Sequence, residues 1–209
     1  AIPGTYYYRV IVGATGDNCA SVTSSALSVT VVADPSPPTA TQSPSATTVC
    51  IGASLTLINP VLGSGGAGTQ TFEYSTTSAV AGFSTTVPTL TPVSAGSYSI
   101  WIRTNPTGSG CGLSTATPYT WTVVADPTIS TQPITSQTVC TGSSPSTLTV
   151  ATTGGTGTFT YQWFSNTTNS NSGGTNLGSG SGAQTATYTP PTSSAGTLYY
   201  YCVITQTGT

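Results

Sequence analysis

Val31-Val32-Ala33-Asp34-Pro35 occurs a second time, 92 residues later, as Val123-Val124-Ala125-Asp126-Pro127. A strand-like run precedes it in both places, as Leu27-Ser28-Val29-Thr30 and as Tyr119-Thr120-Trp121-Thr122. Self-similarity at a fixed long period is typical of a tandem array. The repeated stretch therefore predicts a junction between modules.

The two junctions divide the chain into three predicted segments. Residues 1–33 are expected to form the C-terminal hairpin of a truncated module, residues 34–125 a complete module, and residues 126–209 a module that lacks its last strand. Short runs of β-branched and aromatic residues, such as 84–91 and 96–104, lie between turn signals. No segment shows the apolar period of a helix. We expect an all-β protein of tandem immunoglobulin-like β-sandwich modules arranged end to end.

The composition excludes several classes of function. Charged residues make up 3% of the 209 residues, and the basic ones are Arg9 and Arg103. Two arginines cannot sustain a phosphate-binding surface, so we expect no nucleic-acid partner. No apolar run approaches the ~18 residues of a membrane span, so we expect no membrane insertion. Nucleophilic catalysis needs a base beside Ser or Cys, and the chain has no His or Lys, so we expect no enzyme and no cofactor.

Asp34 and Asp126 are weak candidates for a metal site, because carbonyl oxygens could converge on them at the junctions. One carboxylate per junction is few for a calcium ion, which takes six to eight oxygen ligands. The simpler interpretation is an Asp-Pro turn in which the carboxylate accepts from local backbone N–H groups. A salt bridge to Arg9 or Arg103 is a further alternative. Glu73 stands alone on a predicted strand.

The five cysteines favour an oxidising compartment. The 15-residue spacing from Gly4 to Cys19 recurs from Gly96 to Cys111, so each predicted module carries a late cysteine just before its last strand. An early cysteine, Cys50, opens the central module. The simplest pairing is a Cys50–Cys111 disulfide that closes this module.

The pairing of the remaining cysteines stays open. Cys140 is the early cysteine of the third segment and would pair with a late cysteine beyond residue 209. Cys202 is additional, and we place it in the column that Arg9 and Trp101 occupy in the other copies. It is either a free thiol or the partner of Cys140.

Most aromatic residues are expected to pack in the sandwich cores. Trp163 lies 23 residues after Cys140 and Tyr74 lies 24 residues after Cys50, so both fall on an equivalent central strand. Trp121 replaces Val29 in its copy and is expected to be core as well. Trp101 shares its column with an arginine, which favours an outward orientation and makes it a candidate ligand contact.

The chain also resembles a known family. Residues 4–10, Cys19 and residues 27–32 resemble the immunoglobulin-like repeats of very large secreted surface proteins of Bacteroidetes, and residues 160–164 and 188–191 resemble a common variant of the same repeats. The best-known examples are the SprB-like adhesin filaments of gliding motility, exported by the type IX secretion system. The resemblance implies an extracellular location on the cell surface and brings no catalytic residues.

We therefore expect a structural repeat segment of an extracellular bacterial surface filament or adhesin. It would act as a stalk that presents or distributes adhesive contacts in surface attachment or gliding. Its partners would be neighbouring modules of the same polypeptide or filament, and surface polysaccharide. Two alternatives remain: a glycan- or polymer-binding module that uses Trp101 and the loop 166–182, and a passive spacer of a secreted multidomain enzyme.

The positions of the chain ends lead to two further alternatives. The 209 residues begin within one predicted module and stop within another, which predicts a window on a longer polymer. Alternatively, residues 1–33 of one chain complete the open module of the next by strand exchange, as in donor-strand assembly.

Overall fold

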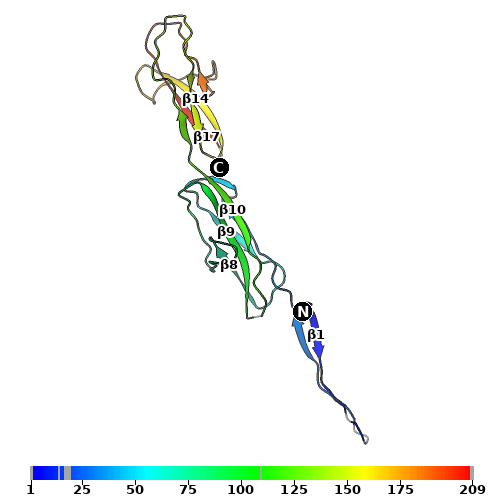
Figure 1. Ribbon diagram of the computed structural model, residues 1–209. Helices are drawn as coiled ribbons and strands as arrows, with labels where there is room; N and C mark the ends of the chain where they lie inside the picture. Colours follow the sequence, from blue (N-terminus) through cyan, green and yellow to red (C-terminus); the bar gives the residue numbers. More distant parts are fainter. Residues whose placement is uncertain (1, 14, 17–19, 109, 208–209) are drawn as a thin grey trace. The chain divides into compact units, whose positions relative to one another are not determined.

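The computed structural model describes residues 2–13, 15–16, 20–108 and 110–207, and every regular element in them is a β-strand (Figure 1). The all-β prediction is confirmed. Most strand pairs are antiparallel and belong to small sheets. The chain divides into two compact units, one of Ala1–Ser45, Ser54–Leu90 and Tyr98–Thr120, the other of Ala46–Ala53, Thr91–Ser97 and Trp121–Thr209. The module boundaries at residues 34 and 126 stay a prediction.

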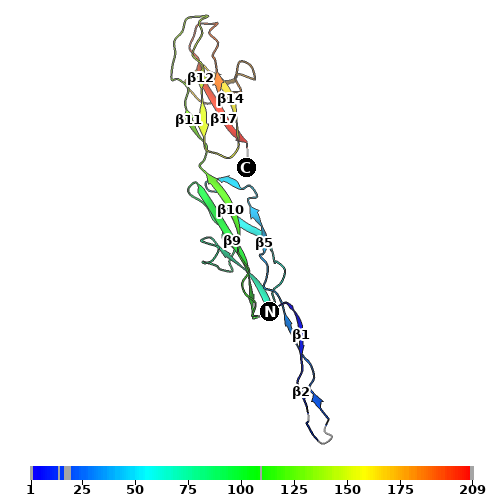
Figure 2. The same cartoon turned by 45° about the vertical axis from the view of Figure 1, so that its right-hand side comes forward.

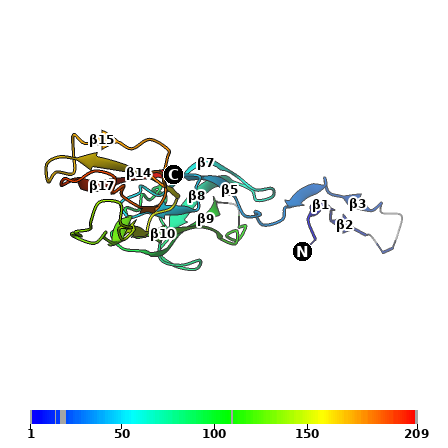
Figure 3. The ribbon, with the colours of Figure 1, turned by 90° about the horizontal axis from the view of Figure 1, so that it is seen from above.

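The N-terminal segment is a long hairpin (Figure 3). β1 (Gly4–Tyr8) pairs antiparallel with β4 (Leu27–Val31), and β2 (Ile11–Val12) pairs with β3 (Val22–Thr23). The described side chains of this hairpin are almost all exposed, including those of its large apolar residues. A two-stranded hairpin by itself is only marginally stable in water. Its apolar side chains therefore contribute little to a core within this chain.

A four-stranded sheet has the order β6-β10-β9-β8. Its strands are β6 (Thr48–Cys50), β10 (Thr117–Val124), β9 (Gly96–Thr107) and β8 (Thr69–Ser75), with β6 parallel to β10 and β8 antiparallel to β9. β5 (Thr39–Ser43) pairs separately with β7 (Thr56–Val61). From Ile100 to Pro106, alternate residues of β9 are buried, because successive side chains of a strand point to opposite faces.

The remaining strands belong to the second unit (Figure 2). β11 (Thr128–Thr131) pairs with β13 (Ala151–Thr153), β12 (Leu148–Thr149) pairs with β16 (Thr187–Tyr188), and β15 (Thr175–Asn176), β14 (Thr158–Asn166) and β17 (Tyr199–Thr207) form a sheet in that order. Their core is built around Trp163, which is 0% exposed and whose Nε1–H donates to the Thr185 carbonyl at 2.9 Å. Leu148, Val150, Ala183 and Tyr188 complete this core.

Four backbone hydrogen bonds occur twice along the chain, each time between corresponding residues. In the first part of the chain the N–H groups of Gly66, Ala53, Gly52 and Tyr74 donate to the carbonyls of Ala33, Cys50, Pro92 and Ser84, respectively. In the second part the N–H groups of Gly155, Ser143, Gly142 and Trp163 donate in the same order to the carbonyls of Ala125, Cys140, Thr192 and Ala183. The two stretches that follow the repeated junctions thus share a set of local connections.

Each junction is held by a pair of glycines. The N–H groups of Gly66 and Gly155 donate to the carbonyls of Ala33 and Ala125, both at 2.8 Å. The preceding glycines, Gly65 and Gly154, have φ angles of 82° and 78°, a conformation that L side chains rarely adopt. We call this arrangement the junction clasp. The junction clasp lies directly after β4 at the first junction and directly after β10 at the second, and it fixes the direction in which the chain leaves each strand.

The burial of three aromatic side chains can be compared with the core positions that the sequence predicts for them. Trp121 and Trp163 are 0% exposed and Tyr74 is 4% exposed, which confirms that the three side chains are buried. Trp163 lies on β14, the middle strand of its sheet, but Tyr74 lies on β8 at the edge of the four-stranded sheet, so its predicted place on a central strand is wrong. Trp101 lies between two fully buried residues, Ile100 and Ile102, and is itself only partly buried. It therefore lies on the opposite face of β9 from the core, as predicted.

We predict that Gly154→Ala destabilises the chain more than Gly142→Ala. Both glycines have φ near 80°, but a Cβ atom on Gly154 would lie 2.5 Å from the Asp126 carbonyl oxygen, whereas one on Gly142 would meet nothing within 4 Å. The control carries only the cost of the left-handed conformation, about 1–2 kcal/mol. Gly154→Ala should cost roughly 1–3 kcal/mol more, because it also strains the clasp. Urea unfolding followed by tryptophan fluorescence measures both, and equal costs would contradict the clasp.

Candidate functional site

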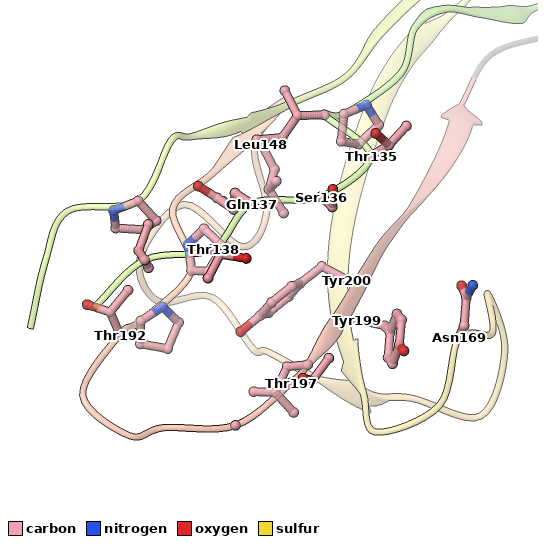
Figure 4. A pocket seen from close by; sticks show the side chains of 18 of the residues that line it. Thr135, Ser136, Gln137, Thr138, Leu148, Asn169, Thr192, Thr197, Tyr199 and Tyr200 are labelled. Atoms are coloured by element: carbon pink, nitrogen blue, oxygen red, sulfur yellow. The ribbon is translucent and has the colours of Figure 1, made fainter. Parts of the chain in front are cut away.

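A hollow of about 740 Å³ opens in the second unit (Figure 4). Three parts of the chain line it: the segment from Pro133 to Leu148, the three residues 169–171 of the long Asn/Gly/Ser loop, and the segment from Pro190 to Tyr201 at the start of β17. The sequence predictions did not include this hollow. The available signal was the proline content of the two main segments, Pro133 and Pro145 in one and Pro190 and Pro191 in the other.

The lining of the hollow carries no charged side chain. It consists of prolines, aliphatic residues, Gly196, the thiol of Cys140, three consecutive tyrosines and the hydroxyl or amide groups of Ser, Thr, Asn and Gln. Such a surface suits a neutral occupant with apolar groups and hydrogen-bonding atoms. It offers no pair of an acid and a base for proton transfer.

Tyr200 forms the central feature of the hollow. Figure 4 shows its ring reaching toward the segment that carries Gln137 and Thr138, while Tyr199 lies on the side of Asn169. The Tyr200 ring also contacts the core, with its centroid 5.6 Å from that of Tyr188. Burial, together with the neighbouring Tyr188, raises the pKa of Tyr200, so it stays a neutral hydroxyl at neutral pH.

Hydrogen bonds fix the walls of the hollow. The Gln137 amide donates to the Ser146 carbonyl at 3.0 Å and accepts from the Ser146 N–H at 2.7 Å. The Thr192 hydroxyl donates to the Ser143 carbonyl at 2.7 Å, and the Thr192 carbonyl accepts from the Gly142 N–H at 2.9 Å. The two proline-containing segments are therefore tied together on the rim.

Neither junction aspartate is among the residues that line the hollow. Asp34 is exposed, and its Oδ1 accepts from the Gly112 N–H at 2.7 Å. The carboxylate thus bonds a backbone N–H, as in the turn interpretation, but one that is distant in sequence. Asp126 is also exposed. Among the described residues, no group of three or more His, Cys, Asp or Glu side chains is placed to hold a metal ion.

Glu73 is not isolated, because Arg103 lies directly opposite it on the β8–β9 ladder. Arg103 Nη2 lies 2.7 Å from Glu73 Oε2, and Arg103 Nε–H donates to the same oxygen at 2.8 Å. The Asn105 amide donates to the other oxygen at 2.7 Å, and the Phe83 ring lies 3.8 Å from the guanidinium carbon. Arg103 is thereby engaged with Glu73 rather than with Asp34.

The surroundings of Glu73 lower the pKa of its carboxyl. Burial by itself acts to raise this pKa, but the hydrogen bonds from Asn105 and Arg103 and the charge of Arg103 together outweigh it. Trp101 lies two residues from Arg103, opposite Ser75. Its role as a ligand contact stays a prediction.

The predicted Cys50–Cys111 disulfide is absent. Cys50 is a free thiol, so it does not pair with Cys111, and Cys140 and Cys202 are free thiols as well. Cys50 pairs with Val124, the last residue of β10, whereas Cys111 precedes the first residue of that eight-residue strand. A disulfide requires Cα atoms within about 7 Å, and an extended strand rises ~3.3 Å per residue. Cys19, on which the 15-residue spacing was based, lies outside the described residues.

The position assigned to Cys202 is wrong by one residue. Cys202 lies opposite Trp163 on the β14–β17 ladder, and Ile102 lies opposite Tyr74 on the β8–β9 ladder. Cys202 therefore corresponds to Ile102, a core position, and Tyr201 corresponds to Trp101. Tyr201 stacks on Phe164 with ring centroids 5.0 Å apart. Burial raises the pKa of the Cys202 thiol.

Comparison with known proteins identifies one family model. Residues 128–209 match a domain of unknown function (DUF8696). No curated protein matches the chain. Within the described residues, no helical segment has the length and hydropathy of a membrane span.

We predict that Glu73→Gln makes stability less dependent on pH. The folded-state pKa of Glu73 lies below its ordinary value of 4.5, so its stabilising effect is complete above pH 4.5 and is lost as pH falls through the lower folded-state value. At pH 7 the variant should lose about 1.5–3 kcal/mol, the range for a hydrogen bond to a charged group. Below the folded-state pKa the difference should shrink. Urea unfolding at several pH values measures this.

The matched control for this experiment is Asp126→Asn, which removes an exposed carboxylate. It should change the urea midpoint little at any pH. A Glu73→Gln variant that shows the same pH dependence as the unaltered chain would show that the Arg103 pair does not stabilise the fold.

We also predict that iodoacetamide modifies Cys140 several times faster than Cys202 in dilute native solution. The thiolate is the reactive form, Cys140 is exposed, and burial both covers Cys202 and raises the pKa of its thiol. Mass spectrometry of the peptides gives both rates, and unfolding in urea should make them equal. A Cys140–Cys202 disulfide would instead leave both unmodified until reduction.

Proposed function

We propose that the chain is a structural repeat segment of an extracellular bacterial surface filament or adhesin, in which immunoglobulin-like β-sandwich modules follow one another end to end. The observation that carries this proposal is the doubled junction clasp. Both Val-Val-Ala-Asp-Pro stretches end a strand, and both are held by the same Gly-Gly hydrogen bond. A structural unit that recurs with its connection is what an array of repeats requires.

The segment after the first junction supports a short and stiff connection. Pro38 is fully buried, and its carbonyl accepts from the Thr117 hydroxyl at 3.3 Å. The Ala40 N–H donates to the Tyr119 hydroxyl at 2.7 Å. Ser36 is bonded as well, because its N–H donates to the Ser64 carbonyl at 2.8 Å and its Oγ accepts from the Ser64 N–H at 2.8 Å. Only Pro35 therefore separates the Asp34–Gly112 contact from the next bonded residue. A proline-containing connection of this length has little conformational freedom.

The surface chemistry fits a stalk with neutral contacts. With 3% charged residues, the chain offers hydroxyl, amide and aromatic groups rather than charges to its surroundings. These groups suit neighbouring modules or a surface polysaccharide as partners. The proposal places the protein outside the cell, as part of surface attachment or gliding.

Electron microscopy of the native surface material tests this proposal. We expect thin beaded fibres with a repeat of about 40 Å, because the longest strand, β9, has 12 residues and a strand rises ~3.3 Å per residue. Antibodies raised against this chain should label the fibres along their length. Labelled globular particles would contradict the filament, and would favour a glycan-binding module or the spacer of a secreted enzyme.

A further inference from the structure

The peptide bond between Asp34 and Pro35 is restrained on both of its sides. Before it, the junction clasp holds the Ala33 carbonyl at 2.8 Å. After it, the Ser36 N–H donates to the Ser64 carbonyl, also at 2.8 Å. Pro35 itself is buried. The atoms of this peptide bond therefore have little freedom to move in the folded chain.

The Asp34 carboxylate lies against Gly112. Its Oδ1 accepts from the Gly112 N–H at 2.7 Å, and a Cβ atom on Gly112 would lie 3.3 Å from its Oδ2. The backbone oxygen of Asp34 is confined as well, because a Cβ atom on Gly65 would lie 2.7 Å from it. Residues 18–72 and 104–125 contain no charged residue besides Asp34, so no charged neighbour from these segments competes with Gly112 for the carboxylate.

An Asp-Pro bond carries its own nucleophile. The aspartate carboxylate can attack the carbonyl carbon of its own residue to form a cyclic anhydride, and proximity strongly favours intramolecular reactions of this kind. In other sequences the nitrogen of the next residue can attack the aspartate side chain instead. The proline nitrogen carries no hydrogen and cannot follow that route. Scission is therefore the reaction that remains for this bond.

We propose that the Asp34–Pro35 bond is a latent self-cleavage site, and that the Gly112 N–H keeps it inactive by holding the Asp34 carboxylate. In the reaction, a carboxylate oxygen of Asp34 bonds to the Asp34 carbonyl carbon, and the bond from that carbon to the Pro35 nitrogen breaks. The electron pair of the broken bond goes to the nitrogen, which takes a proton from the solvent. A water molecule then opens the anhydride and leaves a C-terminal aspartic acid, so the net reaction is hydrolysis of the peptide bond.

Loss of the Gly112 contact would activate the site. The attacking oxygen has to come within bonding distance of the carbonyl carbon, so the carboxylate must give up the Gly112 N–H. A hydrogen bond to an ionised acceptor is stronger than one between neutral groups and opposes this movement. Gly112 lies between β9 and β10 and outside both strands, and such connecting segments open at a lower free energy than strand ladders. The contact can therefore open while the sheet stays intact.

Cleavage at this site would separate one repeat from the next. The same Ala-Asp-Pro recurs at residues 125–127, so cleavage after Asp34 and after Asp126 would release the central segment, residues 35–126. The inference does not depend on the proposed filament, because the reaction uses only groups at the junction itself.

Incubation of the complete chain in mild acid tests the proposal, because acid supplies the proton that the departing nitrogen takes. The buffer is one in which tryptophan fluorescence stays native, and mass spectrometry follows the appearance of the fragment 1–34. Gly112→Pro removes the donating N–H and should release this fragment several-fold faster than the unaltered chain does. Gly112→Ala is the matched control, because it keeps the N–H and requires only a small shift of the exposed Asp34 side chain. It should be cleaved at close to the rate of the unaltered chain.

Unfolding in guanidinium chloride at the same acidity gives a second measurement that does not depend on the folding of a variant. The unfolded chain has lost the Gly112 contact, so the fragment 1–34 should appear several-fold faster than from the native chain. The Asp34–Pro35 and Asp126–Pro127 bonds should then be cleaved at about the same rate, since both follow alanine. Asp34→Glu keeps the charge but places the carboxylate one carbon further away, and it should strongly slow cleavage after residue 34.

Three results would overturn the proposal. Cleavage after Asp34 that is as fast in the native chain as in the unfolded chain would show that the fold does not protect the bond. Equal rates in the folded Gly112→Pro variant and the unaltered chain would show that the Gly112 N–H does not hold the site inactive. Undiminished cleavage in the Asp34→Glu variant would show that the carboxylate is not the nucleophile.

Discussion

The hydrogen bond from a Gly-Gly turn to an alanine carbonyl holds both of the repeated Val-Val-Ala-Asp-Pro stretches. Gly66 holds Ala33, and Gly155 holds Ala125, in each case at the end of a Val-Val strand. A side chain at the preceding glycine would meet the backbone of the aspartate, because Gly65 and Gly154 pack directly against it. The need for a bare backbone at this point explains why glycine pairs follow both junctions. The proline after each aspartate has a fixed φ angle, so the chain leaves the strand in a restricted direction.

Burial in the sheets depends on one strand more than on any other. β10 supplies Trp121 and Val123, which are 0% and 2% exposed, and its presence accompanies full burial of Ile100 and Ile102 on β9. β17 has the same alternation but no second neighbour among the described strands, and its inner residues remain partly exposed. The hydrophobic effect is proportional to the apolar area removed from water. A β10-like strand is therefore the element that completes the core of this fold.

The scarcity of charge shapes both the surface and the candidate site. Arg103 and Glu73 form an ion pair on the β8–β9 ladder. Asn105 donates to the second carboxylate oxygen of Glu73, and the Phe83 ring lies against the Arg103 guanidinium group. The hollow of the second unit is lined by neutral groups throughout. The contacts that such a surface offers are those of shape and of neutral hydrogen bonds. Such contacts are insensitive to salt, in contrast to those between charged surfaces.

The sequence by itself determined the all-β class, the repeated junction and the buried positions of Tyr74, Trp121 and Trp163, because strand alternation and a long period are written in local residue order. It did not determine which residues meet across strands. The region 84–91 forms single bridges at Ser84 and Leu90 instead of a strand, and Pro88 within it lacks the N–H group that a ladder uses. The Glu73–Arg103 pair follows from ladder register, and the Asp34–Gly112 contact joins two residues outside the strands. The one-residue correction at Cys202 agrees with the ladder and also with the five-residue spacing counted from Gly196 to Tyr201. Periodicity assigns a side chain to a face, whereas only the tertiary structure assigns its neighbour, and for the same reason the spacing of cysteines could not establish a disulfide.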